Sequence, residues 1–407
     1  MVDFAIFFDE QKRTLKRVVR ERKRYLYKQI NWSDRLILIT GQRGVGKTTL
    51  MFQHLKENYN NSTKALYISV DNPFFKSISL YEFAMDFEKR GGELLYIDEI
   101  HKYRDWASHI KSIYDASSLK LIVSGSSMIQ ISRQEADLSR RVKHYRLANL
   151  SFREYLYFLD IAEFESVEIE DIFENHIEIA SAIIDKIKPL EHFHSYLNYG
   201  VYPFVIEEPE SFYHYVIGII NQILEVDLPY STNINFSKID KIKKLIYLLS
   251  TSVPLKPNIS KLASAIEISR PTLLEYLHYL ELGSLVNVVN QNARGYGVIS
   301  KPDKLFAYNT NIIRAISQNS NIGTMRETFF VNQIKSSQYN KPSLLDSAIL
   351  LSRVGDFKVV DKYIIEIGGK NKSFAQIADM PDSFVVSDDI EIGFNNKIPL
   401  WLFGFLY

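Results

Sequence analysis

The first third of the sequence predicts an α/β fold with a parallel sheet, and three observations support this prediction. Short apolar runs typical of buried strands alternate with stretches whose apolar spacing is typical of helices. A glycine-rich loop follows the first apolar run, and polar side chains follow the ends of later ones. Because ligands bind at the carboxyl ends of parallel strands, these residues indicate a binding site at one edge of the sheet.

The composition is that of a folded protein. The chain has 407 residues, of which 46% are hydrophobic and 24% charged, and this length predicts two or three domains. The net charge of +1 predicts no polyanion partner for the whole surface, so any DNA-binding surface must be a local patch. The absence of cysteine excludes disulfides and thiolate zinc sites and suits a reducing cytosol. With no secretory signal and no apolar run long enough to span a bilayer, we expect a soluble, cytoplasmic protein without membrane contact.

A strongly basic segment precedes the first strand, and its spacing predicts a helix. Glu21 is the only acid within it. Two interpretations stay open, nucleic-acid binding and a solvated face or subunit contact, and the second is favoured because charge runs usually face water. The basic residues are Lys12, Arg13, Lys16, Arg17, Arg20, Arg22, Lys23, Arg24 and Lys28.

The glycine-rich loop has the pattern G-x-x-x-x-G-K-[ST], between a predicted strand at residues 36–40 and a predicted helix at residues 49–56. Its glycines allow successive backbone N–H groups to face one anion at the positive end of a helix. Lys47 would reach the β- and γ-phosphates, and the Thr48 hydroxyl would bind Mg²⁺. We therefore predict that ATP or ADP binds through Gly41, Gln42, Arg43, Gly44, Val45, Gly46, Lys47, Thr48 and Thr49.

Two adjacent carboxylates end a later strand. Predicted strands at residues 64–71, 93–99 and 120–123 are separated by predicted helices, and the strand at 93–99 ends in Asp98 and Glu99. Asp98 is the candidate for holding Mg²⁺, and Glu99 is the candidate base that polarises the attacking water. Strand alternation would point the two side chains to opposite faces, which suits two different roles.

Further polar candidates follow the next strand. Ser124 and Ser126 are candidates for the hydroxyl that senses the γ-phosphate. Arg140 and Arg141 are candidates for an arginine that neutralises transition-state charge in a neighbouring subunit. A turn-forming role for the serines and a solvated role for the arginines remain alternatives.

The rest of the chain predicts three more regions. Residues 149–236 read as a helical linker, after a first domain at residues 1–148. Residues 237–300 read as a winged helix-turn-helix, with Ser269 capping the second helix of the motif and a wing turn at residues 295–297. Residues 301–407 offer a helix at 323–336 and a strand-rich tail that closes with an apolar strand at 398–407.

Together these residues resemble a family of prokaryotic AAA-type P-loop ATPases whose ATPase domain precedes a region catalogued as domain of unknown function 4143. The resemblance covers almost the whole chain and rests on residues 41–49, 94–101, 123–127, 138–142, 149–155 and 196–203. It implies an AAA/ASCE-type sheet, ATP hydrolysis with Mg²⁺, and a homo-oligomer in which an arginine acts in trans. Arg141 falls on the arginine of the family's Gly-Arg pair, whereas Arg140 replaces the glycine, so which arginine acts stays open.

The same resemblance implies a restriction-endonuclease-like fold for residues 301–407. Glu327, Asp356 and Glu366 match its acidic positions. A nuclease of this kind needs a lysine two residues after the second strand acid, and Gly368 stands there. Either Lys370 or Lys372 would have to act from a shifted place, so we expect a degenerate fold without catalysis.

The sequence is therefore compatible with three different functions. The first is an ATP-driven oligomeric switch or motor that acts on DNA through the winged helix. Its recognition helix offers only Arg270, Thr272, Glu275 and His278 outward, which is little for phosphate binding. The second is an ATP-regulated nuclease using Asp356, Glu366 and Lys370, and the third is a nucleotide-dependent protein-interaction switch.

Overall fold

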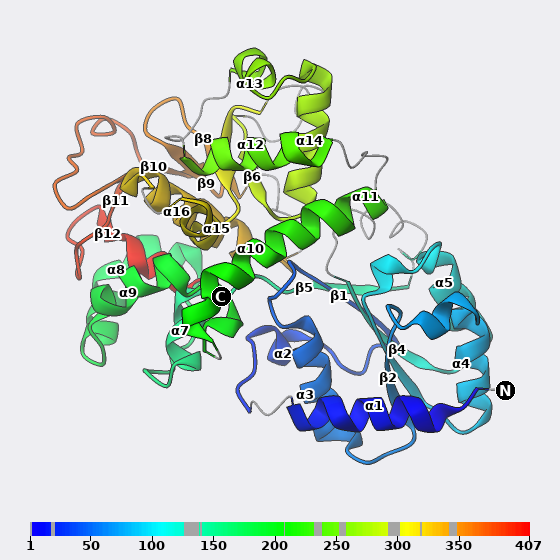
Figure 1. Ribbon diagram of the computed structural model, residues 1–407. Helices are drawn as coiled ribbons and strands as arrows, with labels where there is room; N and C mark the ends of the chain where they lie inside the picture. The colour runs from blue at the N-terminus through cyan, green and yellow to red at the C-terminus, as the bar shows by residue number, and fades with distance from the viewer. Residues whose placement is uncertain are drawn as a thin grey trace. The chain divides into compact units, whose positions relative to one another are not determined.

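The computed structural model describes residues 2–17, 21–125, 138, 141–206, 208–231, 238–251, 258–291, 302–317, 320–341 and 348–407. The chain divides into two compact units, Met1–Leu147 and Ala148–Tyr407, and Figure 1 labels the elements of each. Four predicted features lie outside the described residues: Arg20 of the basic segment, Ser126, Arg140 and the wing turn at 295–297.

The first unit contains the predicted parallel sheet. Its strands lie in the order β2-β3-β4-β1-β5, and every neighbouring pair runs parallel, so β4 lies between β1 and β3. This arrangement agrees with a P-loop NTPase fold. The strands are β1 (Leu36–Thr40), β2 (Ala65–Ser69), β3 (Leu94–Asp98), β4 (Lys120–Gly125) and β5 (Lys143–Arg146).

Helices cover both faces of this sheet because its strands are apolar on both sides (Figure 1). Leu36 and Leu38 pack into one core with residues of α4 and α5. Ile37 and Ile39 pack into the other core with residues of α3. The helices are α1 (Phe4–Arg17), α2 (Leu26–Gln29), α3 (Lys47–Tyr59), α4 (Leu80–Lys89) and α5 (Trp106–Ala116).

Helix α1 covers the edge strand β2. Phe4 and Phe7 lie in the core with α4 and α5, whereas Leu15 packs against the core on the α3 face. Between them, the Gln11 amide bonds to the β2 backbone, accepting from Tyr67 N at 2.6 Å and donating to Ala65 O at 3.4 Å. The side chain of Gln11 thus takes the place that another strand would have at this edge.

The predicted basic helix is shorter than expected. Helix α1 ends at Arg17, and residues 21–24 are not helical. Tertiary contacts hold this later segment: Gln53 donates to Arg22 O at 2.8 Å, and the Arg24 guanidinium donates to Val45 O. Packing against the loop and α3 therefore overrides helix propensity here.

The second unit combines helices with two sheets. One sheet has the order β12-β11-β10-β9-β8. In it β10, β11 and β12 run parallel to one another, whereas β9 runs antiparallel to both of its neighbours, β10 and β8. Strands β6 and β7 form a separate antiparallel pair. The strands are β6 (Val286–Val289), β7 (Lys304–Ala307), β8 (Ile349–Leu351), β9 (Phe357–Val359), β10 (Tyr363–Gly368), β11 (Ser383–Ser387) and β12 (Lys397–Pro399). The helices are α7 (Phe152–Phe158), α8 (Ile169–Ile184), α9 (Pro189–Tyr199), α10 (Phe212–Gln222), α11 (Leu228–Ser231), α12 (Ile239–Thr251), α13 (Ile259–Ala265), α14 (Arg270–Leu282), α15 (Thr310–Ile316) and α16 (Ile322–Ser337).

Two local predictions for this unit are confirmed, the cap of α14 and the helix at 323–336, and one is wrong, the closing strand. Ser269 caps α14 by accepting from Thr272 N at 3.2 Å, and α16 matches the helix predicted at 323–336. The closing strand was wrong: β12 ends at Pro399, and Leu400–Phe405 forms a 3-10 helix. Residues 400–407 are buried without interruption, and such a run cannot distinguish a strand from a buried helix by periodicity.

None of the helices in the described ranges has the length and apolar character needed to cross a bilayer.

Candidate functional site

The glycine-rich loop adopts a conformation that only glycine suits at three positions. Gly44 and Gly46 have φ of 83° and 98°, in the left-handed region. A Cβ on Gly41 would lie 2.4 Å from Leu147 O, which excludes a side chain there. Gly46 is the N-cap of α3, so the loop leads directly into the N-terminal end of that helix.

The Lys47 ammonium lies against the loop. It is buried and donates to Gly41 O at 2.9 Å and to Gln42 O at 3.0 Å. Gln42 and Val45 are also buried, whereas Arg43 and Thr49 are half-buried. The loop therefore curls around a cation at the start of α3, as a site for a polyanion requires.

The Asp98 carboxylate is the centre of a hydrogen-bond cluster at the carboxyl edge of the sheet. Its side chain is buried, at 4% exposure. Oδ2 accepts from Thr48 Oγ1 at 2.7 Å and from Tyr67 OH at 2.8 Å. Oδ1 accepts from the Ser124 hydroxyl and from Glu99 N at 3.0 Å. The structure thus brings three of the predicted site residues together, namely Thr48, Asp98 and Ser124.

Strand alternation explains why these side chains meet. Asp98 follows Leu94 and Tyr96 at two-residue steps, and both of those residues pack on the α3 face. Ser124 follows Ile122 in the same way on β4, and Tyr67 follows Ala65 on β2. All three polar side chains therefore project to the face that α3 covers, where Thr48 stands in the first turn of the helix.

Tyr67 is a member of this cluster that sequence reasoning missed. Burial and then the charge of Asp98 raise the pKa of Tyr67, so its hydroxyl stays protonated and donates to the carboxylate. One signal was available in the sequence. A tyrosine inside an otherwise apolar strand needs a partner for its hydroxyl when it is buried, and Tyr67 stands between Leu66 and Ile68.

The strand alternation on which the prediction for Glu99 is based does not extend to this residue. Glu99 lies outside β3, with φ of 56° in the left-handed region, so strand alternation does not set where its side chain points. Its carboxylate is 20% exposed and lies 3.4 Å from Nε2 of the buried His101. A non-glycine residue in this region stores backbone strain, a feature that clusters at functional sites.

Arg141 lies at the amino ends of the parallel strands, just before β5 begins. Its Nε and Nη2 atoms bond to the Asp115 carboxylate at 3.0 and 3.2 Å. Asp115 is near the end of α5, before β4 begins, and Arg141 itself precedes β5. Because the loop and the Asp98 cluster follow the carboxyl ends of their strands, Arg141, which precedes β5, lies at the opposite end of the parallel strands.

The oxygen atoms of Thr48 and Asp98 are suitable ligands for Mg²⁺. A hydroxyl and a carboxylate oxygen 2.7 Å apart are hard oxygen ligands, and Mg²⁺ binds to one or two such protein groups together with phosphates. Thr48 and Asp98 are therefore the residues that would hold the ion, beside the lysine of the loop.

Two of the three acids predicted in the second unit are paired with lysines. Glu327 on α16 pairs with Lys304 on β7, and Glu366 on β10 pairs with Lys372. Burial raises the pKa of both carboxyls, and the lysines oppose this shift. Asp356 accepts from Ile367 N at 2.8 Å and adds negative charge beside both.

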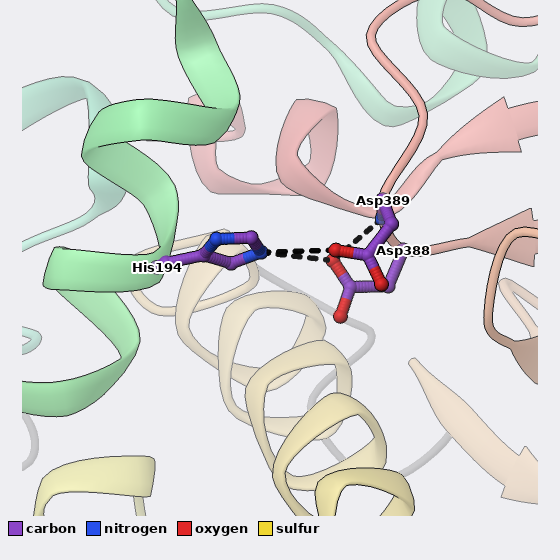
Figure 2. Close-up of side chains that lie close together, drawn as sticks. All are labelled: His194, Asp388 and Asp389. Carbon is purple, nitrogen blue, oxygen red and sulfur yellow. Dashed lines mark hydrogen bonds and ion pairs between the residues drawn. The ribbon is translucent and has the colours of Figure 1, made fainter.

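One group of possible metal ligands in the described ranges has ligand atoms that all lie within 4.8 Å of one another. It consists of His194, Asp388 and Asp389. Figure 2 shows His194, on α9, pointing at both carboxylates, with Nε2 3.1 Å from Asp389 Oδ1. Arg326 bonds to the other carboxylate oxygens, to Asp388 Oδ2 at 2.8 Å and to Asp389 Oδ2 at 3.3 Å. Since Arg326 already bonds to both carboxylates and offsets part of their charge, we assign no ion to this cluster.

Two protein-family models match the chain. One, described as AAA domain, matches residues 33–156. The other, described as Domain of unknown function (DUF8612), matches residues 190–322. This second match does not confirm the resemblance to domain of unknown function 4143.

Comparison with individual proteins adds little to the family matches. The uncharacterized protein MJ1637 of Methanocaldococcus jannaschii is 29% identical over 289 residues, which are 66% of this chain and 61% of that protein. Among solved structures, AMPPCP-bound DnaA from Aquifex aeolicus has 17% identity and a TM-score of 0.26, over 67% of this chain and 88% of that one. PCH-2 of C. elegans has 16% identity and a TM-score of 0.27, over 53% and 63%.

The glycine-rich loop, the parallel sheet and the family match agree with one another: residues 33–156 of this chain match an AAA domain and contain a loop and a sheet of the P-loop type.

Proposed function

We propose that the protein binds ATP at residues 41–49 and hydrolyses it with Mg²⁺, as an oligomeric switch or motor. The contact between the Thr48 hydroxyl and the Asp98 carboxylate supports this function most strongly, because it joins the loop to the carboxylate that a magnesium site needs. The test is ATP turnover by the purified protein with and without Mg²⁺, with particle mass measured in the presence of ATP.

Each residue of the site has a defined task in this proposal. The Lys47 ammonium exchanges the carbonyls of Gly41 and Gln42 for phosphate oxygens. Bound Mg²⁺ would neutralise phosphate charge between Thr48 and Asp98. Glu99 accepts a proton from the attacking water. Ser124 donates to Asp98 and so holds that carboxylate at the end of the neighbouring strand.

The position of Arg141 supports assembly. In its own subunit Arg141 lies at the amino edge of the sheet and is bonded to Asp115, away from the nucleotide loop. An arginine there reaches a γ-phosphate only in a neighbouring copy. We therefore place Arg141 in trans, in a homo-oligomer whose bound ATP is completed by the next subunit.

DNA is the partner proposed for the second unit. Helices α13 and α14 followed by the antiparallel pair β6–β7 support a winged helix, with Arg270, Glu275 and His278 exposed on α14. Two lysines of α12 are already paired, Lys241 with Glu267 and Lys243 with Glu225. DNA binding that weakens steeply with salt would support this role, and salt-insensitive or absent binding would favour a protein-docking module.

A second candidate function is a nuclease, and one observation favours it. A Cβ on Gly368 would lie 2.6 Å from the Cβ and Cγ atoms of Lys372, whose ammonium pairs with Glu366. Lys372 thus fills the place of the lysine missing at position 368. Against this, Asp356, Glu327 and Glu366 do not form a set of ligand atoms within 4.8 Å in the described part of the chain. Mg²⁺-dependent DNA cleavage that Asp356→Ala and Lys372→Ala both abolish would establish the nuclease; uncut DNA would leave a degenerate fold.

A further inference from the structure

Asp98 Oδ2 has two hydroxyl donors that come from different parts of the first unit. Thr48 comes from the first turn of α3, and Tyr67 comes from β2, the edge strand. Thr48 is the residue that would turn its oxygen to a metal ion, so its hydrogen bond to Asp98 is the one that binding would change. The Tyr67 hydroxyl can keep its hydrogen bond to Asp98 when a metal ion binds, because Tyr67 is not one of the residues that would bind the ion.

The tyrosine is held from two sides. Its ring packs on Phe52 of α3 with centroids 4.3 Å apart. Its backbone N–H donates to Gln11 of α1 at 2.6 Å, so α1 fixes the strand segment that carries it. A donor with both its ring and its backbone fixed holds the accepting carboxylate in one rotamer.

We propose that Tyr67 is a positioning residue that aims the Asp98 carboxylate for Mg²⁺, an inference that rests on the proposed ATPase function. Partners of this kind, one step removed from the ion, fix the direction of a ligand and strengthen metal binding. Through Gln11, the N-terminal helix α1 becomes part of the support of the magnesium site. The residue acts through Asp98 and takes no part in the chemistry itself.

The test replaces Tyr67 with phenylalanine, which removes the hydroxyl and keeps the ring on Phe52. Tyr96→Phe is the matched control. Tyr96 is the register partner of Tyr67 on β3, and its hydroxyl bonds to His54 Nδ1 at 2.6 Å rather than to Asp98. Tyr96 is buried and Tyr67 half-buried, so the control removes a hydroxyl that is at least as well shielded from water. Both variants therefore lose one hydrogen-bonded hydroxyl on the α3 face, and only Tyr67→Phe loses a donor to the carboxylate.

The first readout is Mn²⁺ affinity in the presence of ADP, measured by electron paramagnetic resonance. We expect about tenfold weaker Mn²⁺ binding in Tyr67→Phe, and wild-type affinity in Tyr96→Phe. The second readout is turnover against Mg²⁺ concentration. Tyr67→Phe should need about tenfold more Mg²⁺ for half-maximal rate while keeping its kcat at saturation.

The outcomes separate this inference from the function on which it rests. Wild-type Mn²⁺ affinity in Tyr67→Phe, with wild-type protein hydrolysing ATP normally, overturns the role of Tyr67 alone. Equal losses in Tyr67→Phe and Tyr96→Phe overturn it too, because they show a general cost of removing a hydrogen-bonded hydroxyl beneath α3. No ADP-dependent Mn²⁺ binding and no turnover by the wild-type protein overturn both proposals.

Discussion

The Thr48 hydroxyl donates a 2.7 Å hydrogen bond to the Asp98 carboxylate. This contact joins the beginning of α3 to the end of β3, although β4 separates β3 from β1 in the sheet. It places the loop, the helix start and a buried acid in one arrangement.

Glu99→Gln should bind ATP as tightly as the wild-type protein and hydrolyse it at least about a hundredfold more slowly, since the amide cannot accept the proton of water. Nucleotide titration and a phosphate-release assay measure the two effects. Glu93→Gln is the control: Glu93 pairs with Lys64 at the other end of the same strand. Normal turnover by Glu99→Gln would show that another residue is the base.

Arg141→Ala should bind ATP and lose about a hundredfold or more in turnover, because a donor to developing charge is removed. Arg90→Ala, which removes an exposed arginine paired with Asp86 on α4, should change nothing. Mixing Arg141→Ala with Glu99→Gln should restore part of the rate, because a mixed assembly can combine an intact base with an intact arginine. Undiminished turnover by Arg141→Ala alone would exclude this arginine as the finger.

Acid should destabilise the first unit through His54. This buried ring stacks on Trp32 with centroids 4.0 Å apart. Burial, and next the charge of Lys120, lower the pKa of His54 from 6.5 to about 4. Below pH 6.5 the unfolded chain takes up a proton that the folded chain refuses until about pH 4, so the free energy of unfolding falls across this window. The loss is at most about 3 kcal/mol.

Urea unfolding followed by tryptophan fluorescence measures this loss between about pH 7 and about pH 4. His54→Gln removes the titrating group, so the difference in stability between wild type and variant should shrink with acid. A difference that stays constant across the window would show that His54 titrates normally in the folded protein.

A DNA-binding role for the second unit predicts salt-sensitive affinity. Arg270 is the one exposed cation among the outward groups of α14 named above, so Arg270→Ala should weaken DNA binding and lower the salt dependence by about one phosphate contact. Fluorescence anisotropy at several salt concentrations measures both. Lys261→Ala is the matched variant, because it removes an exposed cation from α13, next to the recognition helix but outside it. DNA affinity that Arg270→Ala leaves unchanged would remove α14 from the interface.

The local elements around the site could be predicted from the sequence, because each has a local signal. The glycine pattern and Lys47 identify the loop, apolar runs identify the strands, and two-residue alternation puts Asp98 and Ser124 on one face. The lateral order of the strands has no such signal. The contacts of Tyr67 with Asp98 and of Arg141 with Asp115 depend on that order, and so they were missed.

The second unit shows the same limit. Glu327, Asp356 and Glu366 could be chosen by resemblance, but Lys304, which pairs with Glu327, belongs to β7 and carries no local mark. Helix α14 was predictable because Ser269 caps it. The closing segment was not, since its uninterrupted apolar run fits a strand and a buried helix equally well.

Calorimetric titration of ADP and Mg²⁺ into the wild-type protein and Lys47→Ala tests the central claim most directly, with Lys56→Ala, an exposed lysine of the same helix, as control. Saturable binding is expected for the wild type and Lys56→Ala, and a loss of roughly tenfold to a hundredfold or more is expected for Lys47→Ala, because charge-assisted hydrogen bonds to phosphate disappear. No uptake by the wild-type protein, or equal uptake by Lys47→Ala, would contradict nucleotide binding at this loop.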